Sequence, residues 1–352
     1  MTFLKNAWYV AAWSAEIVQD ALFSRTLLGE PVVYFRKPDG GVAAIGDRCP
    51  HRFAPLHRGL LDGEQVQCPY HGLRFDASGI CVHNPHGSGA IPRTARVRAY
   101  PLAERDLIVW IWMGDATLAD ASLIPDYSFL PAARPNARNL GYLPTAANYL
   151  LLTDNIMDLS HVDFLHPTTL GGGSLSRAKA NVAEEGEAIR ILWRVKNEVV
   201  PPAFARHMPD PEARADQWTE VLWHAPSLMK LSTSVEVAGH QNLDTVNLHI
   251  MTPETETTTH YFYANTRNFL QDDAEFNSVL DKVVAGIFGT EDKPMVEAQQ
   301  RALGVNELVY LDPVMLPVDA GPIRVRRKLE ALISREQHGP EQQERPVAAV
   351  GA

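Results

Sequence analysis

Two short pairs of metal-ligating side chains stand close together in the N-terminal part of the chain. Cys49 and His51 form the first pair, with a proline between them, and Cys68 and His71 form the second, with Pro-Tyr between them. A proline within each pair and Gly72 after the second favour tight loops. Two such loops facing each other would place two thiols and two imidazoles around a single metal centre.

Three interpretations of these pairs compete. A structural zinc site usually pairs Cys with Cys and His with His, whereas here each pair mixes the two. Four unrelated polar loop residues would not arrive as matched pairs. The mixture fits a Rieske-type [2Fe–2S] cluster, in which two Cys hold one iron and two His hold the other. We therefore expect Cys49 and Cys68 to ligate the inner iron as thiolates, and His51 and His71 to ligate the iron nearer the surface.

A second group of possible ligands follows at Asp158, His161 and His166. The two histidines are too far apart in sequence for one face of a continuous helix, but a turn after His161 could bring His166 back beside it. Two His and a carboxylate form the site of non-haem Fe(II) oxygenases, which keep coordination positions open for O₂. The alternative is a pair of capping or core histidines. The upstream cluster favours the metal site, because an electron source implies an acceptor.

The carboxylate that would complete this site cannot be chosen by spacing. The acidic candidates downstream are Asp272, Asp273, Asp281, Glu291 and Asp292.

Length and composition limit the class of protein. The 352 residues are enough for two domains, and 45% apolar with 21% charged residues is ordinary for a globular protein. A net charge of −10 without a Lys/Arg run argues against nucleic-acid binding. No stretch approaches the roughly 18 consecutive apolar residues of a spanning helix. The N-terminal residues lack the layout of a signal peptide, and the chain has few cysteines. We therefore expect a cytoplasmic protein that does not associate with a membrane. Cys81 is most simply a small core residue.

The predicted fold class is α+β. Residues 1–115 read as a small antiparallel β domain that carries the cluster loops, with its aromatic residues Trp8, Tyr9, Trp110 and Trp112 as its core. Strands are expected at 31–36, 42–45 and 107–112, a hairpin at 60–66, and a strand followed by a turn at 73–79. Residues 116–140, rich in Pro, Ala and Asp, read as a linker.

Residues 141–333 are predicted to form a helix-grip domain, an antiparallel sheet covered by helices. Apolar spacing predicts helices at about 147–161, 276–287 and 328–333. Alternation between 188 and 263 predicts strands of one antiparallel sheet. The polar residues 334–352 are expected to be a disordered tail.

Several motifs together resemble the Rieske non-haem iron oxygenases, and among them most closely the oxygenase components of vanillate O-demethylase and dicamba O-demethylase. The resemblance extends over nearly all of the chain before the tail. The motifs are Lys5-Asn-Ala-Trp-Tyr-Val-Ala11, Cys49-Pro-His-Arg52, Cys68-Pro-Tyr-His-Gly72, Asn148-Tyr, Asp154-Asn155-Ile-Met-Asp158-Leu-Ser-His161, His166, Thr252-Pro-Glu-Thr-Glu-Thr and Arg267-Asn-Phe269.

The resemblance implies roles for individual residues. It points to Asp292 as the third iron ligand. Because Pro294 follows two residues later, a helix would restart here with Thr290 as its cap. The resemblance also implies that Asp158 connects His71 of one chain with His161 of the next in a homotrimer, since a carboxylate can accept a hydrogen bond from both imidazoles. Asn155 is expected near the iron without being a firm ligand.

The resemblance further implies a terminal oxygenase whose electrons come from NADH through a separate flavin and iron–sulfur reductase. The chain itself has no Gly-x-Gly-x-x-Gly fingerprint for a dinucleotide. The implied reaction is O₂-dependent O-demethylation of a methoxylated aromatic acid such as vanillate, releasing formaldehyde. Two alternatives stay open: an oxygenase acting on a dicamba-like, sulfonated or other small aromatic, and an electron carrier or ligand-binding protein without mononuclear iron.

The predicted substrate cavity lies between the sheet of the second domain and its helices. Further side chains could anchor a phenol or carboxylate there, and the sequence favours none of them: Arg206, His207, His224, His240, His260 and Arg267.

Overall fold

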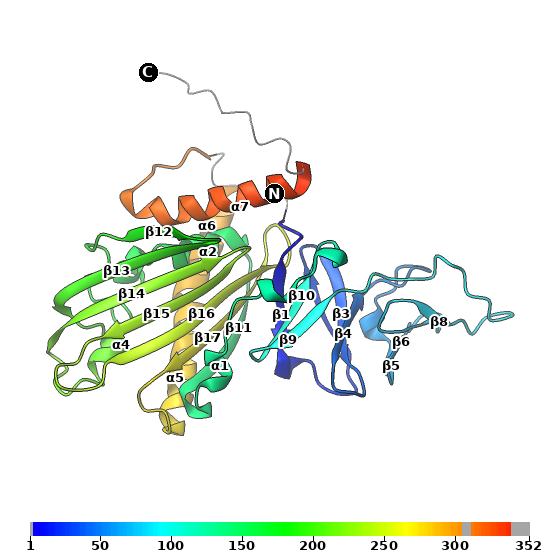
Figure 1. Cartoon of the computed structure of the whole chain (residues 1–352), viewed down its shortest axis with the longest axis horizontal. Helices are drawn as coiled ribbons and strands as arrows, with labels where there is room; N and C mark the ends of the chain where they lie inside the picture. Colours follow the sequence, from blue (N-terminus) through cyan, green and yellow to red (C-terminus); the bar gives the residue numbers. More distant parts are fainter. Residues whose placement is uncertain (1–2, 305–310, 339–352) are drawn as a thin grey trace, which may run out of the picture.

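The computed structural model describes residues 3–304 and 311–338. The chain forms two β-rich units that pack side by side (Figure 1). None of the described helices is long and apolar enough to cross a membrane.

The first unit consists of three small antiparallel sheets, with strand orders β1-β10-β9, β2-β3-β4 and β5-β6-β7-β8. Its strands are β1 (Trp8–Trp13), β2 (Phe23–Leu27), β3 (Glu30–Arg36), β4 (Val42–Gly46), β5 (Leu60–Asp62), β6 (Gln65–Gln67), β7 (Arg74–Phe75), β8 (Cys81–His83), β9 (Leu102–Arg105) and β10 (Ile108–Trp112). The predicted small antiparallel domain is thereby confirmed.

The second unit is built on one antiparallel sheet of seven strands, in the order β11-β17-β16-β15-β14-β13-β12. Its strands are β11 (Arg138–Thr145), β12 (Asn181–Glu185), β13 (Ala188–Val199), β14 (Arg214–His224), β15 (Leu228–Val235), β16 (Leu243–Pro253) and β17 (Thr259–Arg267). Its helices are α2 (Tyr149–Met157), α3 (Val162–Leu165), α4 (Pro202–Ala205), α5 (Ala274–Ile287), α6 (Lys293–Leu303) and α7 (Ala320–His338). The sheet with its covering helices confirms the expected α+β class.

The segment between the units is not a plain linker. It contains 3-10 turns at Ala116–Leu118, Ala121–Leu123 and Pro135–Ala137 and the short helix α1 (Phe129–Ala132). Strand β11 already begins at Arg138, because it pairs with β17 from Arg138↔Thr266 onward. The last residues of the predicted linker therefore belong to the large sheet.

The helix expected at 147–161 is shorter than predicted. Helix α2 ends at Met157, because Asp158 takes an extended conformation with φ −128° and ψ 93°. The Asp158 carboxylate accepts a hydrogen bond from the Ser160 N–H (2.9 Å) and so begins a separate 3-10 turn, Leu159–His161. Helix α3 follows this turn directly. The chain can therefore bend between Asp158 and His166, which is needed to bring His161 and His166 together.

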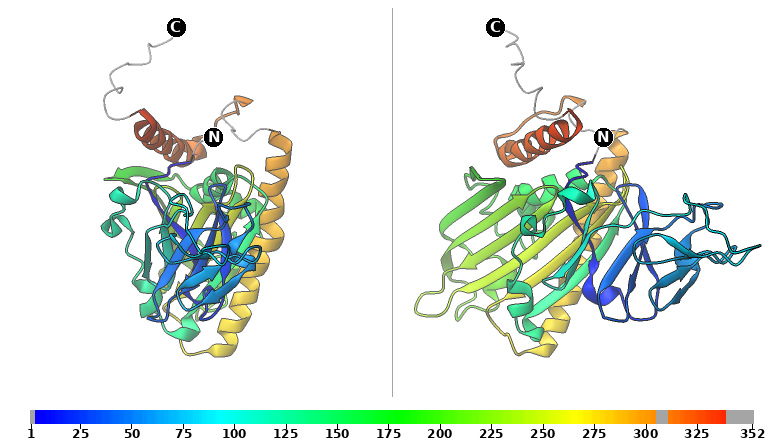
Figure 2. Two further views of the ribbon diagram at one scale, coloured as in Figure 1. Left: turned by 90° about the vertical axis from the view of Figure 1, so that its right-hand side faces the viewer. Right: turned by 45° about the vertical axis from the view of Figure 1, so that its right-hand side comes forward.

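Helix α5 does not end before α6, so the predicted restart at Thr290 is wrong. The Thr290 hydroxyl donates back to the Gly286 carbonyl (2.8 Å) and therefore caps nothing. A π-helical turn, Phe288–Asp292, joins the two helices into the long rod seen in Figure 2. Pro294 then lies in the first turn of α6, where a missing N–H is tolerated.

Helix α7 also differs from expectation. It runs from Ala320 to His338 and includes the first residues of the predicted tail, 334–338. Its buried positions Val325 and Leu329 hold it against the core of the second unit. The rest of the predicted tail, 339–352, lies outside the described residues.

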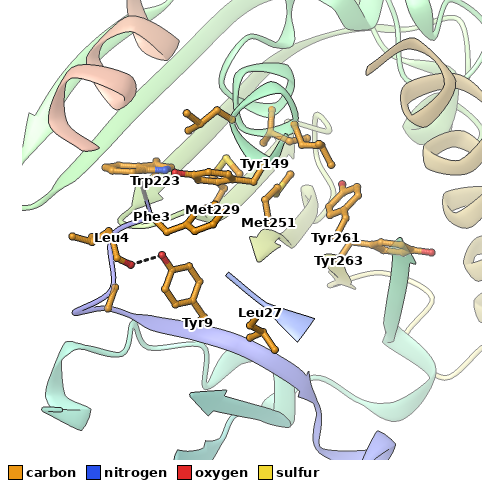
Figure 3. Packing of buried hydrophobic residues seen from close by; sticks show 14 of the residues in the cluster. Phe3, Leu4, Tyr9, Leu27, Tyr149, Trp223, Met229, Met251, Tyr261 and Tyr263 are labelled. Carbon is orange, nitrogen blue, oxygen red and sulfur yellow. Dashed lines mark hydrogen bonds between the residues drawn. The ribbon is translucent and has the colours of Figure 1, made fainter. Parts of the chain in front are cut away.

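The core is shared by the two units. Trp8, Trp110 and Trp112 were expected in the core of the small domain. They are buried there, in one cluster with Leu228 and Phe262 of the large sheet. A second cluster also crosses the boundary: the ring of Phe3 lies 6.1 Å from that of Tyr149, and Tyr9 and Trp223 belong to the same cluster (Figure 3). Apolar burial of this kind is the main stabilising contribution in folding, so the two units support each other.

Candidate active site

The four predicted cluster ligands meet in two facing loops at the end of the first unit. Cys49 and Cys68 are buried, at 1% and 2% exposure, and their thiols lie within hydrogen-bonding reach of each other. His51 is exposed and His71 half-buried, with ring centroids 4.4 Å apart. The thiols therefore face inward and the imidazoles outward, the arrangement that a Rieske cluster needs.

Backbone hydrogen bonds hold these loops in place. The Cys49 N–H donates to Ala54 O (2.9 Å), and the Cys68 N–H donates to Leu73 O (2.8 Å). Gly72 adopts φ +73°, a conformation that other residues rarely take, so the glycine after the second pair is needed for this turn. Burial raises the pKa of the Cys49 thiol to about 11, and bound metal would supply the positive charge that displaces such a proton.

A second group of candidate metal ligands lies in the other unit. One ligand atom from each of His161, His166 and Asp292 lies within 4.8 Å of the others. Asp292 Oδ1 is 3.1 Å from His166 Nε2 and 3.6 Å from His161 Nε2. Two imidazole nitrogens and one carboxylate oxygen at these separations fit a single mononuclear iron. Asp292 and His166 are buried, and His161 is half-buried.

The local backbone explains how these side chains meet. The break after α2 turns the chain back, so that His161 and His166 face each other with ring centroids 5.4 Å apart. The π-helical turn brings Glu291 and Asp292 to the two ring nitrogens of His166. Nδ1 contacts Glu291 Oε2 at 2.5 Å, and Nε2 contacts Asp292 Oδ1 at 3.1 Å. Neighbouring residues of a regular α-helix point in different directions, whereas π-turns of this kind recur at functional sites.

Glu291 therefore does not occupy the position of an iron ligand, for which it was one of the acidic candidates in the sequence. It competed with Asp292 as a possible ligand, but it contacts the ring nitrogen of His166 that points away from Asp292. A carboxylate in this position fixes the tautomer and the orientation of a metal-binding histidine. Only the tertiary contact between α3 and the π-turn reveals this role.

Asp158 and Asn155 also lie beside this group. The Asp158 carbonyl, not its carboxylate, contacts His161 Nδ1 (2.6 Å). The Asn155 amide nitrogen is 3.2 Å from Asp292 Oδ1 and 3.4 Å from His161 Nε2, so Asn155 stands between these two side chains. The carboxylate of Asp158 remains half-buried at the side of the group.

The charges of the site support one another. Burial alone would raise the pKa of Asp292, but hydrogen bonds and charge from His161 and His166 hold it well below its usual range. Burial likewise opposes the charge on His166, but Asp292 and Glu291 raise its pKa. A carboxylate that stays ionised in a buried position is a suitable ligand for a cation.

A cavity of about 210 Å³ opens beside His161, His166 and Asp292. It lies between one face of the sheet and helices α2 and α5. Most of its walls are apolar: Ile156, Leu159, Val162, Leu170, Leu175, Trp193, Val195, Phe204, Leu231, Phe269, Phe276, Leu280, Val284, Ile287 and Phe288. The polar exceptions on the sheet are Gln217, Thr219, Thr233, Thr245, Asn247, His249, Asn265 and Arg267.

The cavity changes the choice of substrate-binding candidates. Of the six side chains considered from the sequence, it includes Arg267 but not Arg206, His207, His224, His240 or His260.

His260 instead bonds to the Tyr142 hydroxyl (2.8 Å) and the Thr26 carbonyl (2.7 Å), a contact between the units. His249 was missed, although it lines the cavity and contacts the Tyr261 hydroxyl through Nδ1 (2.7 Å). Its place in the alternation of β16 was the available signal, but alternation does not say which face is hollow.

Each of the two units matches a known protein family. Residues 7–101 match the Rieske [2Fe-2S] domain, and residues 145–335 match the vanillate O-demethylase oxygenase C-terminal domain. The oxygenase component of dicamba O-demethylase from Stenotrophomonas maltophilia is 40% identical, over 94% of this chain and 98% of the relative. A vanillate O-demethylase oxygenase subunit from a Pseudomonas species is 32% identical, over 95% of this chain and 96% of the relative.

A solved structure of dicamba monooxygenase with non-heme iron and dicamba superposes with a TM-score of 0.81 at 38% identity, covering 96% of this chain and 99% of that one. A carrier with a cluster alone is excluded by these matches. The chain belongs to the vanillate O-demethylase family of Rieske non-haem iron oxygenases, which use a [2Fe–2S] cluster, a mononuclear iron and electrons from a separate reductase.

Proposed function

We propose that this chain is the oxygenase component of an aromatic O-demethylase, which removes the methyl group of a methoxylated aromatic acid such as vanillate and releases formaldehyde. The cavity is the observation that carries the proposal. Its volume of about 210 Å³ is small among ligand pockets and suits a single substituted ring. Its apolar walls would hold the ring against the iron ligands.

The proposal assigns the ligands as the geometry arranges them. Cys49, Cys68, His51 and His71 hold the cluster. His161, His166 and Asp292 hold the mononuclear iron, which when bound supplies the activation of O₂. The apolar walls of the cavity keep water away from the methoxy group while it reacts.

His249 is the candidate that orients the ring. Burial lowers its pKa to about 4, so it is neutral at pH 7. Its Nδ1 is engaged by the Tyr261 hydroxyl, while Nε2 has no partner among the described residues. A neutral imidazole with one free nitrogen can hydrogen-bond a hydroxyl or acid group next to the methoxy substituent.

We also propose a homotrimer that takes electrons from a flavin and iron–sulfur reductase. The cluster loops between β4 and β8 stand at one end of the molecule, away from the second unit, which contains His161, His166 and Asp292 (Figure 1). Transfer between neighbouring chains would shorten this path, with Asp158 joining His71 of one chain to His161 of the next. Phe53 and Tyr70, 70% and 63% exposed beside the cluster loops, offer apolar surface for such a contact. All three cysteines are free thiols, which agrees with the cytoplasm as the proposed compartment.

The test is formaldehyde release from vanillate by iron-loaded protein with NADH, O₂ and a compatible reductase, with the product identified by mass. The matched control is the His166→Ala protein, which keeps the cluster. Formaldehyde with the corresponding catechol supports the proposal. NADH and O₂ consumption without formaldehyde, across vanillate and other methoxylated aromatic acids, would overturn it.

A further inference from the structure

Residues 167–176, called the strap below, turn back after helix α3 and lie against it. The first half of the strap is attached to a backbone carbonyl. The His166 carbonyl accepts hydrogen bonds from the N–H groups of Thr169 (3.1 Å), Leu170 (3.2 Å) and Gly171 (2.9 Å). Gly171 lies so close to α3 that a Cβ added to it would stand 2.7 Å from the Val162 carbonyl oxygen. This half of the strap is thus fixed to the backbone of a candidate iron ligand.

The second half of the strap is attached to a side chain of the same helix. Asp163 is half-buried on α3. Its Oδ1 accepts from the N–H groups of Gly172 (3.2 Å) and Gly173 (2.7 Å), and its Oδ2 accepts from the N–H of Ser176 (2.7 Å). Hydrogen bonds to an ionised acceptor are stronger than those between neutral groups. The Asp163 carboxylate therefore holds three points of the strap at once.

The three N–H groups depend on this carboxylate. Those of Gly172, Gly173 and Ser176 have no second acceptor within residues 3–304 and 311–338. Backbone N–H groups must be paired with protein acceptors or with water. Without the Asp163 carboxylate they would turn to water, and the second half of the strap would come away from α3.

The strap forms one wall of the cavity. The strap residues that line the cavity are Leu170, Gly172, Ser174 and Leu175. Leu170 and Leu175 are half-buried and pack against the hydrophobic core of the second unit. His161 and His166, which flank Asp163 in the sequence, line the same cavity. The wall that Asp163 holds is therefore adjacent to the candidate iron ligands.

We propose that Asp163 is a positioning residue, which holds the strap against α3 so that Leu170 and Leu175 close the cavity beside His161 and His166. The proposal goes beyond the proposed function, because it concerns the wall of the cavity and holds for whichever aromatic compound the cavity accepts. A closed apolar wall excludes water and confines the ring next to the iron ligands. A loosened strap should admit water and weaken substrate binding.

Two substitutions loosen the strap by different routes. Asp163→Asn keeps the size of the side chain but has one acceptor oxygen and one NH₂ group. Whichever way its amide turns, at least one N–H of the strap faces a donor. Gly171→Ala leaves Asp163 unchanged and pushes the strap away from α3 through the added Cβ.

Asp216→Asn is the matched control. Asp216 lies on β14, and its Oδ1 accepts from the backbone N–H of Asn197 (2.8 Å). Asp216 does not line the cavity beside His161 and His166. The control therefore removes a carboxylate that holds a backbone N–H, as in Asp163→Asn, but at a site outside the cavity wall.

The first measurement is hydrogen exchange of the iron-loaded holoenzyme without substrate, followed by mass spectrometry of peptides that contain residues 172–176. Exchange in these peptides should be about ten- to a hundredfold faster in Asp163→Asn, because charge-assisted hydrogen bonds are lost. Asp216→Asn should leave the exchange of these peptides unchanged. Equal exchange of the strap in Asp163→Asn and Asp216→Asn would overturn the proposal.

The second measurement reports whether the cavity opens. Trp193 lines the cavity and is 4% exposed, so acrylamide reaches its ring only when a wall moves. Comparison with chains that also carry Trp193→Phe isolates its share of the fluorescence. We expect stronger quenching of Trp193 in Asp163→Asn and Gly171→Ala, with unchanged iron content and cluster spectrum. Unchanged quenching in both variants would show that the strap does not close the cavity, and would also overturn the proposal.

The third measurement connects the wall to turnover and uses vanillate, so it rests on the proposed function. The KM of Asp163→Asn should rise about tenfold and its kcat should change less, because the wall contacts the substrate before and during the reaction. An unchanged KM in a variant with fast exchange would remove the positioning role. Absence of formaldehyde from the unaltered chain would count against the proposed function alone, since exchange and quenching need no substrate.

Discussion

The Glu291→Ala substitution tests whether iron affinity depends on a carboxylate that is not itself an iron ligand. His166 is 1% exposed, and Glu291 Oε2 contacts its Nδ1 at 2.5 Å. In the Glu291→Ala protein this N–H would have no acceptor, and the ring could turn away from Asp292. Losses of ten- to a hundredfold in metal affinity, about 1.4–2.8 kcal/mol, are usual for such changes.

The exposure of Glu291 refines this magnitude. Its side chain is 31% exposed, so water can partly replace the lost acceptor. We therefore expect about tenfold for Glu291→Ala rather than the upper limit. Glu291→Gln retains an acceptor oxygen without the charge, so it should lose less than Glu291→Ala. Asp292→Ala, which removes a ligand, should lose more than either.

The assay is competition for Fe(II) with a chelator of known affinity, using the visible spectrum of the cluster as an internal control. The cluster lies in the other unit, so its spectrum should be the same in all the variants. Iron affinity of Glu291→Ala within twofold of the unaltered protein would refute the positioning role. Loss of iron as complete as in Asp292→Ala would instead make Glu291 a ligand.

Three further predictions concern the same region. His166→Ala should reduce the iron content from about three to about two per chain while the cluster spectrum persists, and an unchanged iron count would remove His166 from the site. Asp158→Asn should leave both metal sites filled but suppress turnover, and full activity would refute the bridging role. His249 has a pKa of about 4 in the folded chain and about 6.5 when unfolded, so the unfolded state binds its proton first as the pH falls. The free energy of unfolding of the metal-free protein should therefore fall by about 3 kcal/mol between pH 6.5 and 4, as measured by denaturant unfolding. The fall should be smaller in His249→Gln. Equal pH dependence in the two proteins would contradict this prediction.

The cluster site was predictable because its ligands are local. Cys49 and His51, and likewise Cys68 and His71, each share one short loop, so their pairing is visible without knowledge of the fold. The strands around them were predictable for the same reason, since hairpins join neighbouring residues. Residue type and short-range spacing were sufficient to predict the class of cofactor.

The iron site was predictable only in part. The pair His161 and His166 stands out in the sequence, but the choice between Glu291 and Asp292 needed the resemblance to a family. The structure turns both acids toward His166 through a π-helical turn, and a turn of this kind leaves no periodic signal in the sequence.

Tertiary structure alone decided which side chains face the cavity. His249, Asn265 and Arg267 follow the same alternation as many other strand residues, and alternation divides a strand into two faces without telling which face is hollow. The antiparallel register of β16 and β17 places them in rows, and α5 covers those rows. The sharing of Trp8 and Trp112 between the two units was hidden for the same reason: burial is a property of packing, and the sequence states only that these residues are apolar.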